Sequence, residues 1–102
     1  MIPDIPGRRV ASWSELKDKG DFCVVDPGAA DFGTSQTIIA FICPCCGDKS
    51  FVPLKPSDPQ GWDFDGNRDR PTVSPSIYFN MNHPEARCRW HGFITAGVFK
   101  TV

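Results

Sequence analysis

The segment Cys43-Pro44-Cys45-Cys46-Gly47 separates two runs of β-forming residues and decides how this part of the chain folds. Residues 36–42 before it are rich in β-branched side chains, and residues 51–54 after it are largely apolar. Two such runs around a short turn predict an antiparallel hairpin with the cysteines at its tip. Pro44 stiffens the turn and Gly47 can adopt a positive φ, and both properties suit a metal knuckle.

A second group of metal-binding residue types occurs near the end of the chain. Cys88-Arg89-Trp90-His91 offers a thiolate and an imidazole with C-x-x-H spacing. Three thiolates and one imidazole fill the four positions of a tetrahedral Zn²⁺ site, so the expected zinc is structural and stabilises a small domain. The predicted ligands are Cys43, Cys46, Cys88 and His91. Cys45 stays open as an alternative to Cys46.

The composition is that of one small globular domain. The chain has 102 residues, of which 40% are hydrophobic and 23% charged, and we expect a single domain over residues 1–102 with an extended arm at 1–10. The formal net charge of −1 provides no broad positive field for nucleic acid or membrane. Nine glycines and ten prolines disfavour a helical bundle and favour short strands joined by turns.

The cysteine usage and the apolar runs predict a cytoplasmic protein. Three of the five cysteines lie within four positions, which suits metal binding better than a disulfide framework. Free thiols persist in a reducing compartment. The first residues do not resemble a signal peptide, and the longest apolar run, residues 38–43, is too short to cross a bilayer.

One short helix is expected near the N-terminus. Ser12 and Glu15 have the spacing of a capping box, which predicts a helix over residues 13–19. Gly20 can end this helix in the left-handed conformation.

The rest of the chain predicts strands and turns. Trp62 and Phe64 alternate with acidic residues, so both rings are expected on one face of a sheet. Residues 72–79 are extended, but Pro75 restricts them to a sheet edge or a bulge. Further strands are expected at residues 22–25, 89–95 and 98–102. The predicted fold is mainly β, a small antiparallel sheet domain with zinc knuckles and one short N-terminal helix.

Three other candidate sites have simpler structural interpretations. Residues 63–69 resemble a calcium loop but lack the required glycine and glutamate, so a solvated turn is expected. Ser74 and Ser76 are candidate nucleophiles for a histidine base, but no nucleophile elbow surrounds them. Their expected role is to cap backbone groups beside Pro75. Cys23 lies in an apolar strand, which predicts a buried, unreactive thiol.

Two alternatives to a structural zinc protein stay open. Arginines near Trp62 and Trp90 offer a nucleic-acid face with stacking rings, although interleaved acidic residues favour a mixed-charge surface. These arginines are Arg68, Arg70, Arg87 and Arg89. Residues 88–92 also match the C-x-x-H-G half of a Rieske iron–sulfur centre, but the C-x-H half is missing.

Residues 61–67, 70–77 and 88–97 resemble a family of small phage and bacterial zinc-binding proteins of unknown function. The family pattern is W-x-W/F-x-G-N, then P-T-x-S/T-P-S-I, then a Cys/His segment followed by G-F-I, often preceded by C-P-x-C-G. The resemblance covers residues 36–102. Some members carry the label ammonia monooxygenase, which is a misannotation because that enzyme needs membrane spans and a copper site. The resemblance implies a phage or prophage origin and zinc ligation by Cys43, Cys46, Cys88 and His91, while the additional Cys45 departs from the pattern.

These observations predict a non-catalytic, zinc-binding phage accessory or structural protein that acts through protein–protein contacts. Its expected partner is a host protein or a virion component, in the cytoplasm of the bacterial host or on the virion. The first alternative is a nucleic-acid-binding zinc-ribbon module. The second is a redox protein or enzyme that uses an iron–sulfur cluster or an open zinc site.

Overall fold

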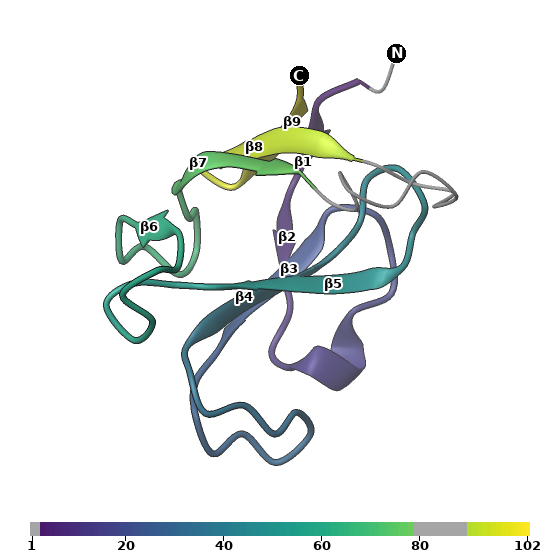
Figure 1. Cartoon of the computed structure of the whole chain (residues 1–102). Helices are drawn as coiled ribbons and strands as arrows, with labels where there is room; N and C mark the ends of the chain where they lie inside the picture. Colours follow the sequence, from purple (N-terminus) through teal and green to yellow (C-terminus); the bar gives the residue numbers. More distant parts are fainter. Residues whose placement is uncertain (1–2, 79–89) are drawn as a thin grey trace, which may run out of the picture.

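The computed structural model of the chain describes residues 3–78 and 90–102, which form two β-sheets lying one above the other (Figure 1). The strands are β1 (Ile5–Pro6), β2 (Arg8–Arg9), β3 (Asp21–Val25), β4 (Ile38–Ile42), β5 (Lys49–Pro53), β6 (Asp63–Phe64), β7 (Val73–Tyr78), β8 (His91–Thr95) and β9 (Val98–Thr101). The lower sheet in Figure 1 has the order β2-β3-β4-β5, and the upper sheet has the order β1-β9-β8-β7-β6. The mainly β class predicted from the sequence is confirmed.

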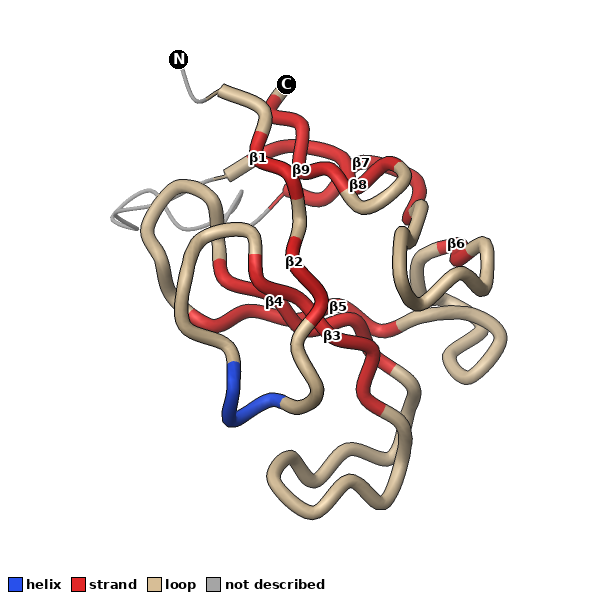
Figure 2. Tube along the Cα trace, turned by 180° about the vertical axis from the view of Figure 1, so that it is seen from behind, coloured by secondary structure: helices blue, strands red, loops and turns tan. Residues whose placement is uncertain are grey.

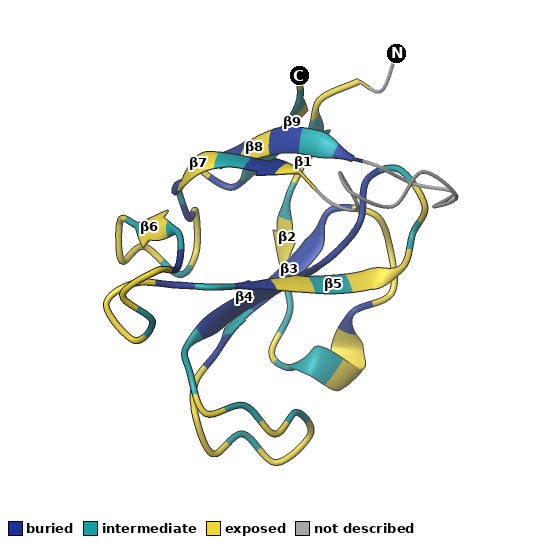
Figure 3. Ribbon diagram, in the orientation of Figure 1, coloured by how far each residue is buried: buried dark blue, intermediate teal, exposed yellow. Residues whose placement is uncertain are grey.

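Strand β4 is buried along its whole length because both of its faces are covered (Figure 3). Ile39 and Phe41 point into the core between the two sheets, where the Phe41 ring packs against Trp90 and Phe99. Ile38 and Ala40 point to the opposite face, where they pack in a second cluster with Leu16. Alternate side chains of a strand face opposite sides, so an uninterrupted apolar run fits a strand covered on both faces.

The hairpin predicted around the cysteine segment is confirmed. Strands β4 and β5 pair antiparallel, from Ile38 opposite Pro53 to Ile42 opposite Lys49. The cysteines therefore occupy the turn at one end of the lower sheet.

The N-terminal arm connects the two sheets. In the arm, β1 pairs with β9 of the upper sheet, and β2 pairs in parallel with β3 of the lower sheet. Gly7 lies between them, and its N–H donates to the carbonyl oxygen of Gly97 at 2.7 Å. Figure 2 views the molecule from behind and shows the arm running from β1 to β2.

The predicted N-terminal helix is not formed beyond a single turn. A 3-10 turn spans Trp13–Glu15, and Leu16 already has an extended backbone. The Ser12 side chain makes no capping hydrogen bond, although the Glu15 carboxylate accepts from the N–H of Ala11. Within the described part of the chain, no helix is long and apolar enough to span a membrane.

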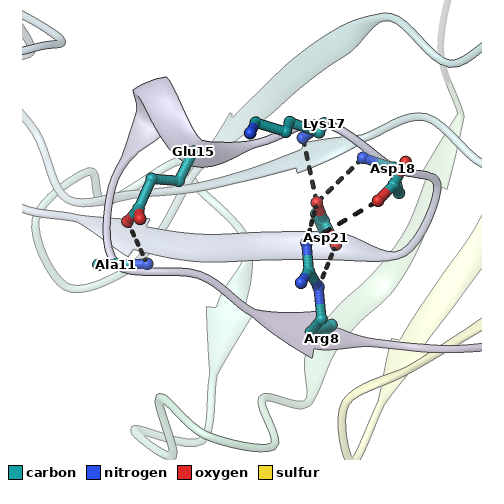
Figure 4. A network of polar contacts seen from close by, with 6 residues as sticks. All are labelled: Arg8, Ala11, Glu15, Lys17, Asp18 and Asp21. Atoms are coloured by element: carbon teal, nitrogen blue, oxygen red, sulfur yellow. Dashed lines mark hydrogen bonds and ion pairs between the residues drawn. The ribbon is translucent and has the colours of Figure 1, made fainter.

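The carboxylate of Asp21 takes the place of the missing helical turn (Figure 4). It accepts the backbone N–H groups of Lys17 and Asp18, each at 3.0 Å, and the guanidinium of Arg8 at 2.9 and 3.0 Å. A helix would direct those N–H groups to carbonyl oxygens one turn earlier. The Arg8 hydrogen bond, with the two backbone donors, lowers the pKa of this buried carboxyl to about 2.

Candidate functional site

Strands β7 and β8 bring a serine and a histidine into contact. The Oγ of Ser76 lies 2.9 Å from Nε2 of His91. The two strands pair antiparallel with Tyr78 directly opposite His91. Ser76 is two residues before Tyr78, so its side chain shares the same face of the sheet. The contact therefore follows from the strand pairing.

A bulge in β7 sets the direction of the serine side chain. The register between β7 and β8 shifts between Val73 and Ile77, as the sequence predicted from Pro75. Proline has no N–H for the ladder, and a bulge changes the direction of neighbouring side chains. Nε1 of Trp62 donates to the backbone carbonyl of Ser76 at 3.3 Å and fixes the strand just after the bulge.

The serine–histidine pair is half-buried and open to solvent on one side. The Tyr78 ring packs on the imidazole of His91, with 4.6 Å between the ring centroids and 32° between the planes. This packing limits rotation of the imidazole. Two residues on the same sheet face, Tyr78 and Phe93, are 42% and 41% exposed.

A hydroxyl that hydrogen-bonds an imidazole nitrogen is the arrangement of a nucleophile and its general base. The 2.9 Å separation lies within the range needed for proton transfer. When Nε2 accepts the hydroxyl proton, the neutral imidazole carries its own proton on Nδ1. The sequence predicted that the Ser76 hydroxyl caps a backbone group, and in the structure this hydroxyl contacts His91.

The cysteine segment forms a tight turn after β4. The Cys43 N–H donates to the carbonyl of Asp48, and the Gly47 N–H donates to the carbonyl of Cys43, both at 2.9 Å. Gly47 has a φ of +78°, as its predicted role in the turn requires. Cys43 and Cys45 pack in or against the core between the sheets, whereas Cys46 is exposed.

The four-ligand zinc set stays a prediction. Cys88 lies outside the described residues, and so does His83, the other histidine of the chain. Over the described ranges, no three histidine, cysteine or acidic side chains gather into a metal site. His91 directs Nε2 toward Ser76, so this nitrogen already has a partner.

The other sequence candidates have structural roles in the part of the chain that the structure describes. Cys23 is buried in β3, and burial raises the pKa of its thiol to about 11, which keeps it protonated. Asp65 accepts the N–H of Asn67 at 3.0 Å, which closes the predicted turn. Arg68 forms two 2.9 Å hydrogen bonds with Asp26, in keeping with a mixed-charge surface. Arg87 and Arg89 lie outside the described residues.

Comparison with protein families gives a match over most of the chain. Residues 10–102 match the family described as "Bacterial ubiquitination-like system serine protease (BubE)". No curated protein and no solved structure matches the chain. The family description names an enzyme, so the expectation of a non-catalytic protein is wrong. That expectation depended on a closed zinc site and on the lack of a nucleophile elbow around Ser76. The histidine that contacts Ser76 comes from another strand.

Proposed function

Because this chain belongs to the BubE family, described as serine proteases of a bacterial ubiquitination-like system, we propose that Ser76 is its nucleophile and His91 its general base. The observation that carries the proposal is the 2.9 Å hydrogen bond between their side chains. A serine nucleophile needs an adjacent general base, and the bond joins two half-buried residues on an exposed sheet face.

The proposed reaction is acyl transfer through an ester on Ser76. The Oγ of Ser76 attacks the carbonyl carbon of the scissile amide while Nε2 of His91 takes the hydroxyl proton. The carbon–nitrogen bond then breaks, and His91 passes that proton to the leaving nitrogen. Water attacks the resulting ester and gives a proton to His91, which returns it to Oγ as the carboxylate product leaves.

Two neighbouring aromatic residues position the pair in this mechanism. Trp62 holds the carbonyl of Ser76, which keeps the serine backbone in place after the bulge. Tyr78 packs on the imidazole of His91 and keeps its ring in the plane that reaches Oγ. Such fixation lowers the entropy lost when the reacting groups align.

We propose that the substrate is a ubiquitin-like polypeptide or a conjugate of one. The support is the family description, which places these proteases in a ubiquitination-like system. A protein substrate agrees with the protein–protein contacts expected from the sequence. The phage and virion associations stay predictions.

The proposed function is tested by cleavage of the ubiquitin-like protein of the same system. Ser76→Ala is expected to reduce the cleavage rate by about a thousandfold or more, because the attacking oxygen is lost. Ser74→Ala is the matched control, since Ser74 is an exposed serine on the other side of Pro75. Full cleavage by Ser76→Ala with an unchanged fold would contradict the assignment.

We also propose that the cysteine turn binds zinc through its thiolates, with Cys88 as a further ligand. The support is the chemistry of the donors and the tight turn closed by Gly47. Such an ion would stabilise the end of the β4–β5 hairpin. His91 stays with Ser76 in this proposal, and Cys45 and Cys46 both stay candidates.

A further inference from the structure

Three exposed apolar side chains surround the histidine of the serine–histidine pair. Tyr78 lies opposite His91 on β7. On the other side, the N–H of Val102 donates to the carbonyl of His91 at 2.9 Å, which places Val102 opposite it beside β8. Phe93 follows His91 by two residues along β8. Directly opposed and alternate residues share one face of a sheet, so all three lie on the same face as the imidazole.

These side chains are unusual in their exposure. Tyr78 is 42% exposed, Phe93 41% and Val102 71%. They are three of the four large hydrophobic residues that the described part of the chain leaves exposed, and the fourth, Phe51, belongs to the other sheet. Figure 3 shows exposed stretches on β7 and β8 in the upper sheet. A gathering of exposed apolar side chains marks an interaction surface.

We propose that Tyr78, Phe93 and Val102 form an apolar collar that binds apolar side chains of the polypeptide substrate next to the scissile bond. This inference rests on the proposed function, because the collar is defined by its position around the general base. Its occupant follows from its place: the Tyr78 ring lies 4.6 Å from the imidazole, and that imidazole contacts the attacking oxygen. A chain that presents a carbonyl to Ser76 must pass over the collar.

The collar also gives the protease a sequence preference. Apolar side chains next to the cleaved bond cover Phe93 and Tyr78 and remove their surface from water. Polar side chains at the same positions leave that surface solvated. Lys100 of β9 lies directly opposite Phe93 of β8, so a charged residue borders the collar on the β9 side.

The test compares two fluorophosphonate probes joined to the same linker, one carrying three leucines and the other three serines. The Oγ of Ser76 forms a bond to phosphorus, fluoride leaves, and the hydroxyl proton passes to His91. The natural sequence is expected to react about tenfold faster with the leucine probe. Phe93→Ser is expected to bring that ratio close to one by slowing the reaction with the leucine probe.

Phe51→Ser is the matched control, because Phe51 is similarly exposed at 47% but lies on the other sheet. It is expected to keep the preference for leucine. Equal rates with both probes, or a preference that survives Phe93→Ser, overturns the collar and leaves the serine–histidine pair intact. A change in oligomeric state in Phe93→Ser without a change in the ratio also overturns it, in favour of a surface for a second copy. If neither probe labels Ser76, the proposed function fails as well.

Discussion

At the scale of single residues, Ser74 and Ser76 are the same amino acid in different chemical settings. Ser74 is exposed and pairs with Asp63 of β6, whereas Ser76 faces His91 across to β8. Pro75 lies between them at the bulge. The sequence places both serines beside the proline, but only the strand pairing distinguishes them.

His91 is the residue for which two chemical roles compete. The sequence predicted a zinc ligand, whereas the hydrogen bond to Ser76 favours a general base.

We expect His91→Ala to keep the zinc content of the natural sequence and to lose proteolysis. Cys43→Ser is expected to lose zinc and to lower the melting temperature, because thiolate ligation stabilises the hairpin end. Elemental analysis measures the zinc content of both purified variants. Loss of zinc from His91→Ala would return this histidine to the ligand set.

At the scale of secondary structure, hairpins are predictable here because their signals are local. The turn between β8 and β9 has Ala96 at a φ of 48° and Gly97 at 79°, as a two-residue hairpin turn requires. The helix prediction failed because Asp21 lies outside the predicted helix and captures its N–H groups. Only the Glu15 half of the capping box forms at the start of the turn, and a carboxylate three to four residues further along the chain decides how far the turn continues.

The Asp21 network makes stability depend on pH. The folded pKa of Asp21 is about 2, below its ordinary value of 3.8, so its ionised form stabilises the fold above that ordinary value. This stabilisation is lost as the pH falls from about 4 through 2. Because Arg8 is largely exposed, we expect a loss of about 1–2 kcal/mol in the free energy of unfolding.

Urea unfolding at pH 6 and pH 2 tests this dependence against Asp21→Asn. At pH 6 the variant is expected to be less stable than the natural sequence by about 2 kcal/mol, because an amide cannot replace the ion pair. At pH 2 the two are expected to converge. A difference that stays constant between the two pH values would show that the ionised carboxylate contributes nothing.

At the scale of the whole molecule, the two sheets depend on a close approach between the N-terminal arm and the last hairpin. A Cβ atom on Gly7 would lie 2.2 Å from the carbonyl oxygen of Gly97 and 2.8 Å from the ring of Phe22. Those atoms belong to both sheets, so no single strand can move to relieve the contact. The sequence predicted an extended arm, but it carried no signal for this contact between residues 90 positions apart.

Gly7→Ala is expected to lower the melting temperature by about 10 °C, because it overpacks the junction of the sheets. Gly33→Ala is the control, since no heavy atom lies within 4 Å of its Cβ position. Differential scanning calorimetry of both variants checks the expectation. Equal melting temperatures would mean that the arm can shift without loss of stability.

The sequence therefore predicted the strands better than their assembly. Alternation and turn residues locate β4, β5, β8 and β9, because those signals lie within a few residues. The contact between Ser76 and His91 depends on the register of β7 against β8, and the stacking of the two sheets depends on the N-terminal arm. Neither is encoded locally, so the serine was predicted to be a backbone cap and the protein to be non-catalytic.

The most direct test of the serine–histidine assignment is to map a fluorophosphonate adduct by mass spectrometry, using fragment ions that separate Ser74 from Ser76. The natural sequence is expected to carry one adduct on the Oγ of Ser76, and His91→Ala is expected to carry none under the same conditions. An adduct on Ser74, or equal labelling of Ser76 with and without His91, would contradict the assignment.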